Sequence, residues 1–132
     1  MLFASIVIAS LFLSLISFSL VLAYSPLPVP SVTIVSPIDG DIIQSLQKKD
    51  SIGTVISFSA KSDIPIYKCT LFVNEQAYTD IYGASYNSTV TADLPQGNYR
   101  IYITCLDTNG IEGKSNAVSF YVCKNKGQCK KF

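Results

Sequence analysis

The feature that most constrains this chain is a two-residue alternation of apolar and polar side chains that begins at Ser31. The alternation comes in short runs, and turn-forming residues such as Asn109-Gly110 separate one run from the next. A period of two buries one face of a strand, whereas an amphipathic helix needs a period of about 3.6. The chain after residue 31 is therefore predicted to form a domain made of β-strands.

The runs predict about seven short strands, which is typical of an Ig-like or fibronectin-III-like antiparallel β-sandwich. The expected strands cover residues 32–35, 54–60, 67–73, 87–92, 99–106 and 117–122, with an ambiguous stretch at 78–85 and a short piece at 42–43. We expect this all-β sandwich to occupy 32–122, after a proline-rich connector at 24–31 and before a basic tail at 123–132. Because Trp is absent, the core has to come from Ile, Val, Phe and Tyr.

The first 23 residues are apolar, and no charged residue precedes Asp39. As a helix this segment would be about 34 Å long, enough to cross a bilayer. Three interpretations of residues 1–23 stay open: a cleaved secretory signal that ends at Ala23, a membrane anchor, or a helix retained in a filament. A hydrophobic N-terminal helix before a β head also resembles archaeal type IV pilins, although the basic leader of that family is missing here. Each interpretation places 24–132 outside the cytoplasm, either secreted or anchored at the cell surface.

The segment before the predicted strand at 99–106 reads Leu94-Pro95-Gln96-Gly97-Asn98-Tyr99 and resembles the tyrosine corner of Ig-like sandwiches. In that corner the tyrosine hydroxyl bonds to the backbone a few residues upstream and fixes the crossing between the two sheets. We therefore expect Tyr99 to have a structural role.

A more specific pattern covers residues 69–115. It begins with Cys69-Thr-Leu71-Phe-Val73-Asn74 and continues with Leu94-x-x-Gly97-x-Tyr99-x-x-Tyr102-Ile103-x-Cys105-x-Asp107-x-x-Gly110-x-x-Gly113-x-Ser115. This pattern resembles the Ig-like repeats of archaeal cell-surface proteins. The resemblance implies an extracellular structural or adhesive role and brings no catalytic residue. Glu75 replaces the usual turn glycine and Ile101 replaces the usual tryptophan, so a different turn and a smaller core ring set are expected there.

Four cysteines fit an oxidising compartment, and four cysteines allow three pairings. Cys69 and Cys105 lie in phase with the apolar positions of two predicted strands that are neighbours in a sandwich, whereas Cys123 and Cys129 enclose a short loop after the last strand. The favoured scheme is therefore 69–105 with 123–129. A zinc site of four thiolates is disfavoured because no C-x2-C pair is present.

The composition disfavours most catalytic chemistry and nucleic-acid binding. With no His, triads, imidazole proton relays and His-ligated metal sites lack their central residue, and a net charge of +1 cannot neutralise a run of phosphates. We expect no enzyme activity, no cofactor and no metal site. Asp107-x-Asn109-Gly110-x-Glu112 resembles a calcium loop, but it lacks the remaining EF-hand spacing and is expected to be a hairpin turn.

Two features of the sequence bear on partners. Asn87-Ser88-Thr89 is an N-glycosylation sequon, so Asn87 is a candidate glycan site if the domain is extracellular. Lys124, Lys126, Lys130 and Lys131 make the tail basic, which suits either plain solvation or docking on an anionic surface.

The sequence favours a non-catalytic extracellular or cell-surface protein with a structural or adhesive role. Its partners would be a surface protein, a glycan or copies of itself, with membrane contact through residues 1–23. The strand at 32–35 is expected to be held most weakly and to be available for pairing with a neighbour. One alternative is a pilin-like filament subunit that keeps residues 1–23. A second is a secreted carbohydrate- or ligand-binding module that uses Tyr78, Tyr82 and Tyr86.

Overall fold

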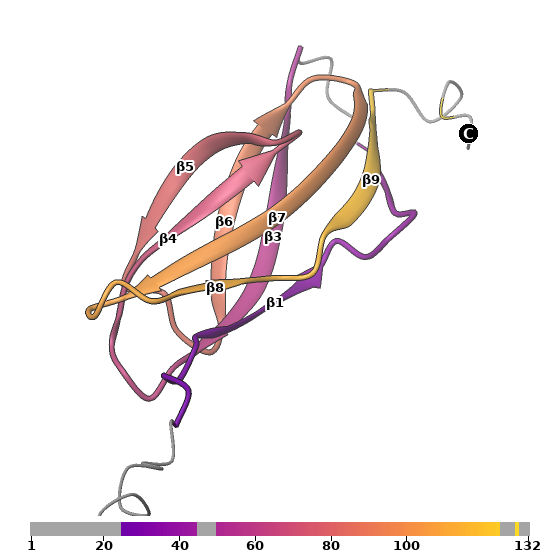
Figure 1. Cartoon of the computed structure of the whole chain (residues 1–132). Helices are drawn as coiled ribbons and strands as arrows, with labels where there is room; N and C mark the ends of the chain where they lie inside the picture. Colours follow the sequence, from indigo (N-terminus) through magenta and orange to yellow (C-terminus); the bar gives the residue numbers. More distant parts are fainter. Residues whose placement is uncertain (1–24, 45–49, 125–128, 130–132) are drawn as a thin grey trace, which may run out of the picture.

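The computed structural model describes residues 25–44, 50–124 and 129, and these fold into two β-sheets that pack face to face (Figure 1). The described residues contain nine strands: β1 (Ser31–Ser36), β2 (Ile42–Gln44), β3 (Ile52–Lys61), β4 (Ile66–Val73), β5 (Gln76–Tyr82), β6 (Ser88–Leu94), β7 (Gly97–Asp107), β8 (Glu112–Lys114) and β9 (Val118–Cys123). The prediction of an all-β sandwich is confirmed. The helix expected over residues 1–23 lies outside the described residues.

The smaller sheet has the order β1-β3-β6, and the larger has the order β2-β9-β7-β4-β5, with β8 pairing to β7 beyond the end of β9. Neighbouring strands are antiparallel except β2 and β9, which run parallel. The short piece expected at 42–43 is strand β2, whereas the three-residue strand β8 was not expected, so the count of about seven strands was too low. A three-residue strand shows too little alternation to stand out in a sequence.

The core lies between the sheets and consists mostly of residues that the alternation placed in the expected strands, together with Ile52 and Leu94, which lie just outside them. It is made of the inward side chains Val32, Ile34, Ile52, Ile56, Phe58, Ala60, Cys69, Leu71, Val73, Ala92, Leu94, Ile101, Ile103, Cys105, Val118, Phe120 and Val122. Ile101 is fully buried at the position where the related pattern carries tryptophan. A core of branched aliphatic residues with a few rings therefore suffices to hold the two sheets together.

Both disulfides of the favoured scheme are present. Cys69 on β4 and Cys105 on β7 face each other directly in the register of the larger sheet, with 4.0 Å between their Cα atoms, and both side chains are fully buried. The bond therefore links neighbouring strands within one sheet. Cys123 at the end of β9 bonds to Cys129, with 5.7 Å between the Cα atoms. In the basic tail, the Nζ atom of Lys124 lies 3.3 Å from Asp50 Oδ1.

The chain crosses from the smaller to the larger sheet between β6 and β7, and Tyr99 lies near the start of β7. The Tyr99 hydroxyl donates to the carbonyl oxygen of Pro95 over 2.6 Å, and the ring lies 5.9 Å from the ring of Phe120. Partial burial raises the pKa of the Tyr99 hydroxyl. This arrangement ties the turn at Pro95 to the first residues of β7.

We expect Tyr99→Phe to lower the free energy of unfolding by about 1 kcal/mol, because it removes this hydrogen bond and keeps the ring. Urea unfolding followed by far-UV circular dichroism measures the change. Tyr86→Phe is the matched control, because the Tyr86 ring is exposed and contacts the ammonium group of Lys61 through its face. An equal loss in both variants would show that the Tyr99 hydroxyl has no special role.

Strand β1 is held more firmly than the sequence suggested. It pairs with β3 from Ser31 to Ser36, and its Val32 and Ile34 side chains are buried in the core. The Ile34 N–H also donates to Asn116 Oδ1 over 3.0 Å, which ties β1 to the segment before β9. β1 is nevertheless an edge strand of the smaller sheet, so its pairing with a neighbouring molecule stays a prediction.

Candidate functional site

The outward face of the larger sheet carries a hollow of about 540 Å³ where β7 and β9 run side by side. Its floor consists of side chains that alternate with the core positions. Asn98 and Arg100 come from β7, and Tyr121 and Ser119 lie opposite them on β9. All four belong to the polar phase of strands whose other phase faces the core.

One rim of the hollow is the turn formed by Asp39, Gly40 and Asp41, which leads into β2. Backbone bonds hold this turn against β9: the Gly40 N–H donates to the Ser119 carbonyl over 2.8 Å, and the Tyr121 N–H donates to the Asp41 carbonyl over 2.9 Å. The Ser119 N–H donates to Asp39 Oδ1 over 2.8 Å. The Ile38 N–H donates to Asp41 Oδ2 over 2.9 Å, so each of the two carboxylates at this rim accepts a backbone hydrogen bond.

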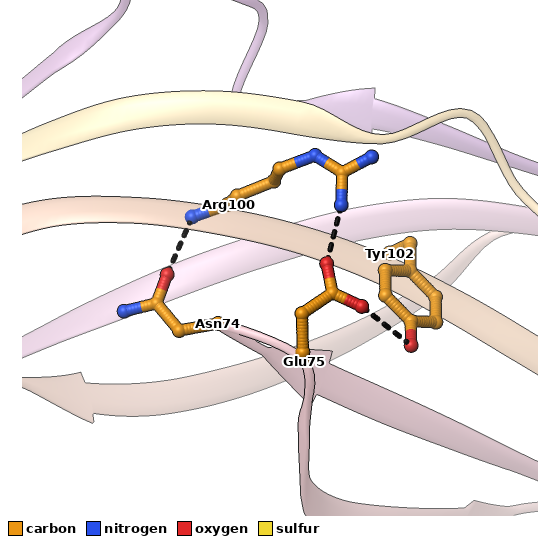
Figure 2. Close-up of polar contacts among 4 residues, drawn as sticks. All are labelled: Asn74, Glu75, Arg100 and Tyr102. Carbon is orange, nitrogen blue, oxygen red and sulfur yellow. Dashed lines mark hydrogen bonds and ion pairs between the residues drawn. The ribbon is translucent and has the colours of Figure 1, made fainter.

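The opposite rim is Asn74, at the turn between β4 and β5 (Figure 2). The Asn74 N–H donates to the Arg100 carbonyl, and the Arg100 N–H donates to Asn74 Oδ1, both over 2.9 Å. Figure 2 shows that the amide nitrogen of Asn74 points away from Arg100. The side-chain amide of Asn74 thus extends the backbone pairing of β7 and leaves its donor group at the rim.

The turn itself explains how Glu75 substitutes for glycine. Asn74 and Glu75 have φ values of 49° and 66°, the left-handed region that two-residue hairpin turns require. Asparagine tolerates this region, whereas a non-glycine, non-Asx residue such as Glu75 is strained there by about 1 kcal/mol. The Glu75 carboxylate accepts from the Arg100 guanidinium and from the Tyr102 hydroxyl (Figure 2). These contacts offset the strain and fix the guanidinium beside the hollow.

Tyr102 lies next to this ion pair and is 8% exposed although it is on the outward face. Its ring stacks on Phe72 with 4.8 Å between centroids, and Lys114 Nζ lies 4.0 Å from the ring centroid. Burial, followed by the negative charge of Glu75, raises the pKa of the Tyr102 hydroxyl, and these effects outweigh the opposite effect of Arg100.

We expect the free energy of unfolding to fall as the pH rises above about 10, and to fall less steeply in Tyr102→Phe. A phenol whose pKa is raised by folding contributes stability that is complete below its unfolded pKa. That contribution is lost as the pH rises through the folded-state pKa. Urea unfolding at a series of alkaline pH values, with tyrosinate absorbance followed in parallel, measures both effects. Identical slopes for the two proteins would contradict the assignment to Tyr102.

The candidate residues named from sequence fall elsewhere on the surface. Asn87 is exposed in the loop before β6, and its glycosylation stays a prediction. The tyrosines proposed as a carbohydrate patch have separate partners. The Tyr78 hydroxyl accepts from the Asp93 N–H, Tyr82 packs edge-on against Tyr67 with centroids 6.1 Å apart, and Tyr86 lies against Lys61.

Asp107 forms the expected turn. Its Oδ1 accepts from the N–H groups of Asn109 and Ile111, each over 2.9 Å, and the Gly110 N–H donates to the Asp107 carbonyl over 3.0 Å. Its buried Oδ2 makes no hydrogen bond within the described part of the chain. In residues 25–44, 50–124 and 129, no group of three His, Cys, Asp or Glu side chains is placed to hold a metal ion.

Sequence reasoning missed the hollow. The alternation already showed that Asn98 and Arg100 face away from the core, and it showed the same for Ser119 and Tyr121. The missing information was that the turn at residues 39–41 lies against β9 and that Asn74 lies beside β7, because both contacts depend on strand order.

The comparisons identify the fold. A fibronectin(III)-like module of Clostridium thermocellum CbhA matches with a TM-score of 0.58 and 22% sequence identity, over 71% of this chain and 96% of that module. The described domain is therefore similar in fold to fibronectin(III)-like modules. At this identity the match establishes the fold and transfers no residue. A CARDB domain of a Pyrococcus furiosus protein, solved with di-metal ions, matches with a TM-score of 0.44 and 17% identity over 74% of this chain and 96% of that chain.

No protein-family model matches the sequence, and no curated protein matches it either. The two disulfides are typical of proteins that fold in an oxidising compartment. Within the described residues, no helix has the length and hydropathy needed to span a bilayer.

Proposed function

We propose that this protein is a non-catalytic module of the cell surface with a structural or adhesive role. The observation that carries the proposal is the buried Cys69–Cys105 bond, which joins the two central strands of the larger sheet. A bond at this place is part of the core, so the domain is built for an oxidising compartment. The preformed polar hollow on the outward face supports an adhesive role, because it offers a contact surface apart from the core.

We further propose that Asn87 carries an N-linked glycan. The Asn87 side chain is exposed, and Thr89 at the third position of the sequon is exposed as well. Asn87→Gln then removes the glycan mass from the protein isolated from its native envelope, whereas Asn125→Gln, which lies outside any sequon, leaves the glycan mass in place.

The test combines intact mass with location. The full-length protein is isolated from the envelope and from the cytosol of its native cells, and its mass is measured before and after reduction. We expect an envelope protein that gains four hydrogens on reduction, two for each bond. Beads coated with the same protein should attach to those cells. A cytosolic protein with free thiols would overturn the location, and beads that do not attach would overturn the adhesive role.

A further inference from the structure

We propose that the hollow over β7 and β9 is a binding site for a neutral saccharide. This inference rests on the proposed adhesive function and names the ligand of that surface. Four properties of the hollow carry it: the mixture of hydrogen-bonding groups, the balance of charge, an aromatic side chain in the lining, and the rigidity of the rims.

The hydrogen-bonding groups suit hydroxyls, which donate and accept at the same time. Asn98 offers an amide with both functions and Ser119 offers a hydroxyl, and within the described residues neither side chain makes a hydrogen bond. Asp39 Oδ1 is taken by the Ser119 N–H, which leaves Oδ2 as an acceptor. A carboxylate oxygen beside amide and hydroxyl groups can pair with adjacent hydroxyls of one sugar ring.

The charge of the site argues against an anionic ligand. Three lining side chains are charged: Asp39, Asp41 and Arg100. The Arg100 guanidinium is already paired with Glu75. A phosphate, sulfate or uronic acid would therefore meet two carboxylates and a cation that is already neutralised, whereas a neutral saccharide meets no repulsion.

Tyr121 provides a surface for the apolar face of a sugar. It is half-buried, it lines the hollow, and its hydroxyl accepts from Gln96 Nε2 over 3.3 Å. The face of a tyrosine ring is apolar and its hydroxyl is polar, so it can contact both the apolar face of a sugar ring and the hydroxyl groups at its edge. The Asp39–Asp41 turn and Asn74 stand on opposite sides of this ring and of Arg100.

The site is preformed, so a ligand does not have to order it. Each rim is fixed by at least two hydrogen bonds that involve the backbone of β7 or β9. The rims are three strand spacings apart, about 14 Å, which is enough for a short oligosaccharide lying across the strands. Preorganisation of this kind favours affinity because less conformational entropy is lost on binding.

The test uses the full-length protein with both disulfides intact on an array of immobilised oligosaccharides. The array carries neutral chains built from glucose, galactose, mannose and N-acetylglucosamine, together with sialylated and sulfated chains. We expect retention on neutral chains. Titration calorimetry with the best neutral oligosaccharide should show binding that is weaker by about tenfold in Tyr121→Ala and by about fivefold in Asn98→Ala.

Each variant has a matched control outside the hollow. Asn109→Ala removes an exposed amide beyond the far end of β7, and Tyr86→Ala removes an exposed ring of the patch first suggested by sequence. Both should bind like the unmodified protein. Thermal unfolding shows whether each variant folds. Because Asn98 is exposed, Asn98→Ala still tests the site if Tyr121→Ala does not fold.

Three outcomes would overturn the inference: no retention on neutral chains, a preference for acidic chains, or binding that Asn98→Ala leaves unchanged while Tyr86→Ala loses it. The bead assay judges the proposed function separately. If coated beads attach to cells although the protein binds no saccharide, the saccharide proposal is overturned and the adhesive role stands.

Discussion

Replacing Cys69 and Cys105 together by alanine should lower the free energy of unfolding by about 4 kcal/mol. The bond closes a loop of 36 residues, and a cross-link of that span removes much of the conformational entropy of the unfolded chain. Both sulfur atoms are also fully buried, so alanine leaves unfilled space between β4 and β7. Urea unfolding of the full-length protein at neutral pH measures the loss.

The second bond provides the control, because its loop is much shorter. Cys123 and Cys129 are six residues apart, and the same account gives about 2 kcal/mol for their replacement by alanine. The ratio of the two losses in the free energy of unfolding distinguishes the effect of loop length on chain entropy from a general effect of removing sulfur atoms. Equal losses would contradict the entropic explanation.

Gly113→Ala should lower the free energy of unfolding by about 3 kcal/mol, the upper range for inserting a group into packed structure. A Cβ at Gly113 would lie 1.9 Å from the carbonyl oxygen of Pro30 and 2.8 Å from its carbonyl carbon. Both atoms are backbone, so relief requires the chain before β1 to move. That movement would pull on Val32 and Ile34, which are buried in the core. Thermal and urea unfolding measure the loss.

The control is Gly53→Ala on β3. A Cβ there meets only the ends of side chains, the nearest being Asp93 Oδ1 at 3.4 Å. Alanine in an extended strand also restricts the unfolded chain, so we expect an unchanged or slightly higher stability. If Gly53→Ala is as damaging as Gly113→Ala, the close approach of Pro30 is not the cause.

The sequence was sufficient for the fold class, most of the long strands and both disulfides, because each depends on a local pattern, whereas the stretch that overlaps β5 stayed ambiguous. Alternation marked Ile101 and Ile103 as core residues, and it placed Cys69 and Cys105 in that same phase. The role of Gly113 was not readable, since the segment that crosses it is Pro30, more than eighty residues earlier. The pattern of the related repeats contained this glycine, but a pattern does not show what lies above it.

The candidate site was harder to predict for the same reason. Asn98 and Arg100 were visible as outward residues of one strand, yet a hollow exists only where Asn74 and the turn at 39–41 rise beside them. The position of Asn74 depends on the pairing of β4 with β7, and the position of the turn depends on the parallel pairing of β2 with β9. The cysteines indicated that β4 and β7 are neighbours, but they do not show that Asn74 bonds to Arg100, and the parallel pairing of β2 with β9 has no local signature. The three tyrosines attracted attention because they recur every four residues, but their partners lie on different strands.

The bond between Cys69 and Cys105 also sets how far the domain can be stretched. A chain under tension is pulled through its two ends, and once unfolded it lengthens by at most about 3.4 Å per residue. With the bond intact, the segment between the two cysteines, which are 36 positions apart, cannot contribute, and this shortens the maximal extension by about 120 Å. Under tension, the outer strands would give way while β4, β5, β6 and β7 stay in one closed loop. Reduction of this bond would therefore increase the maximal extension of the unfolded chain as well as lower the stability of the fold.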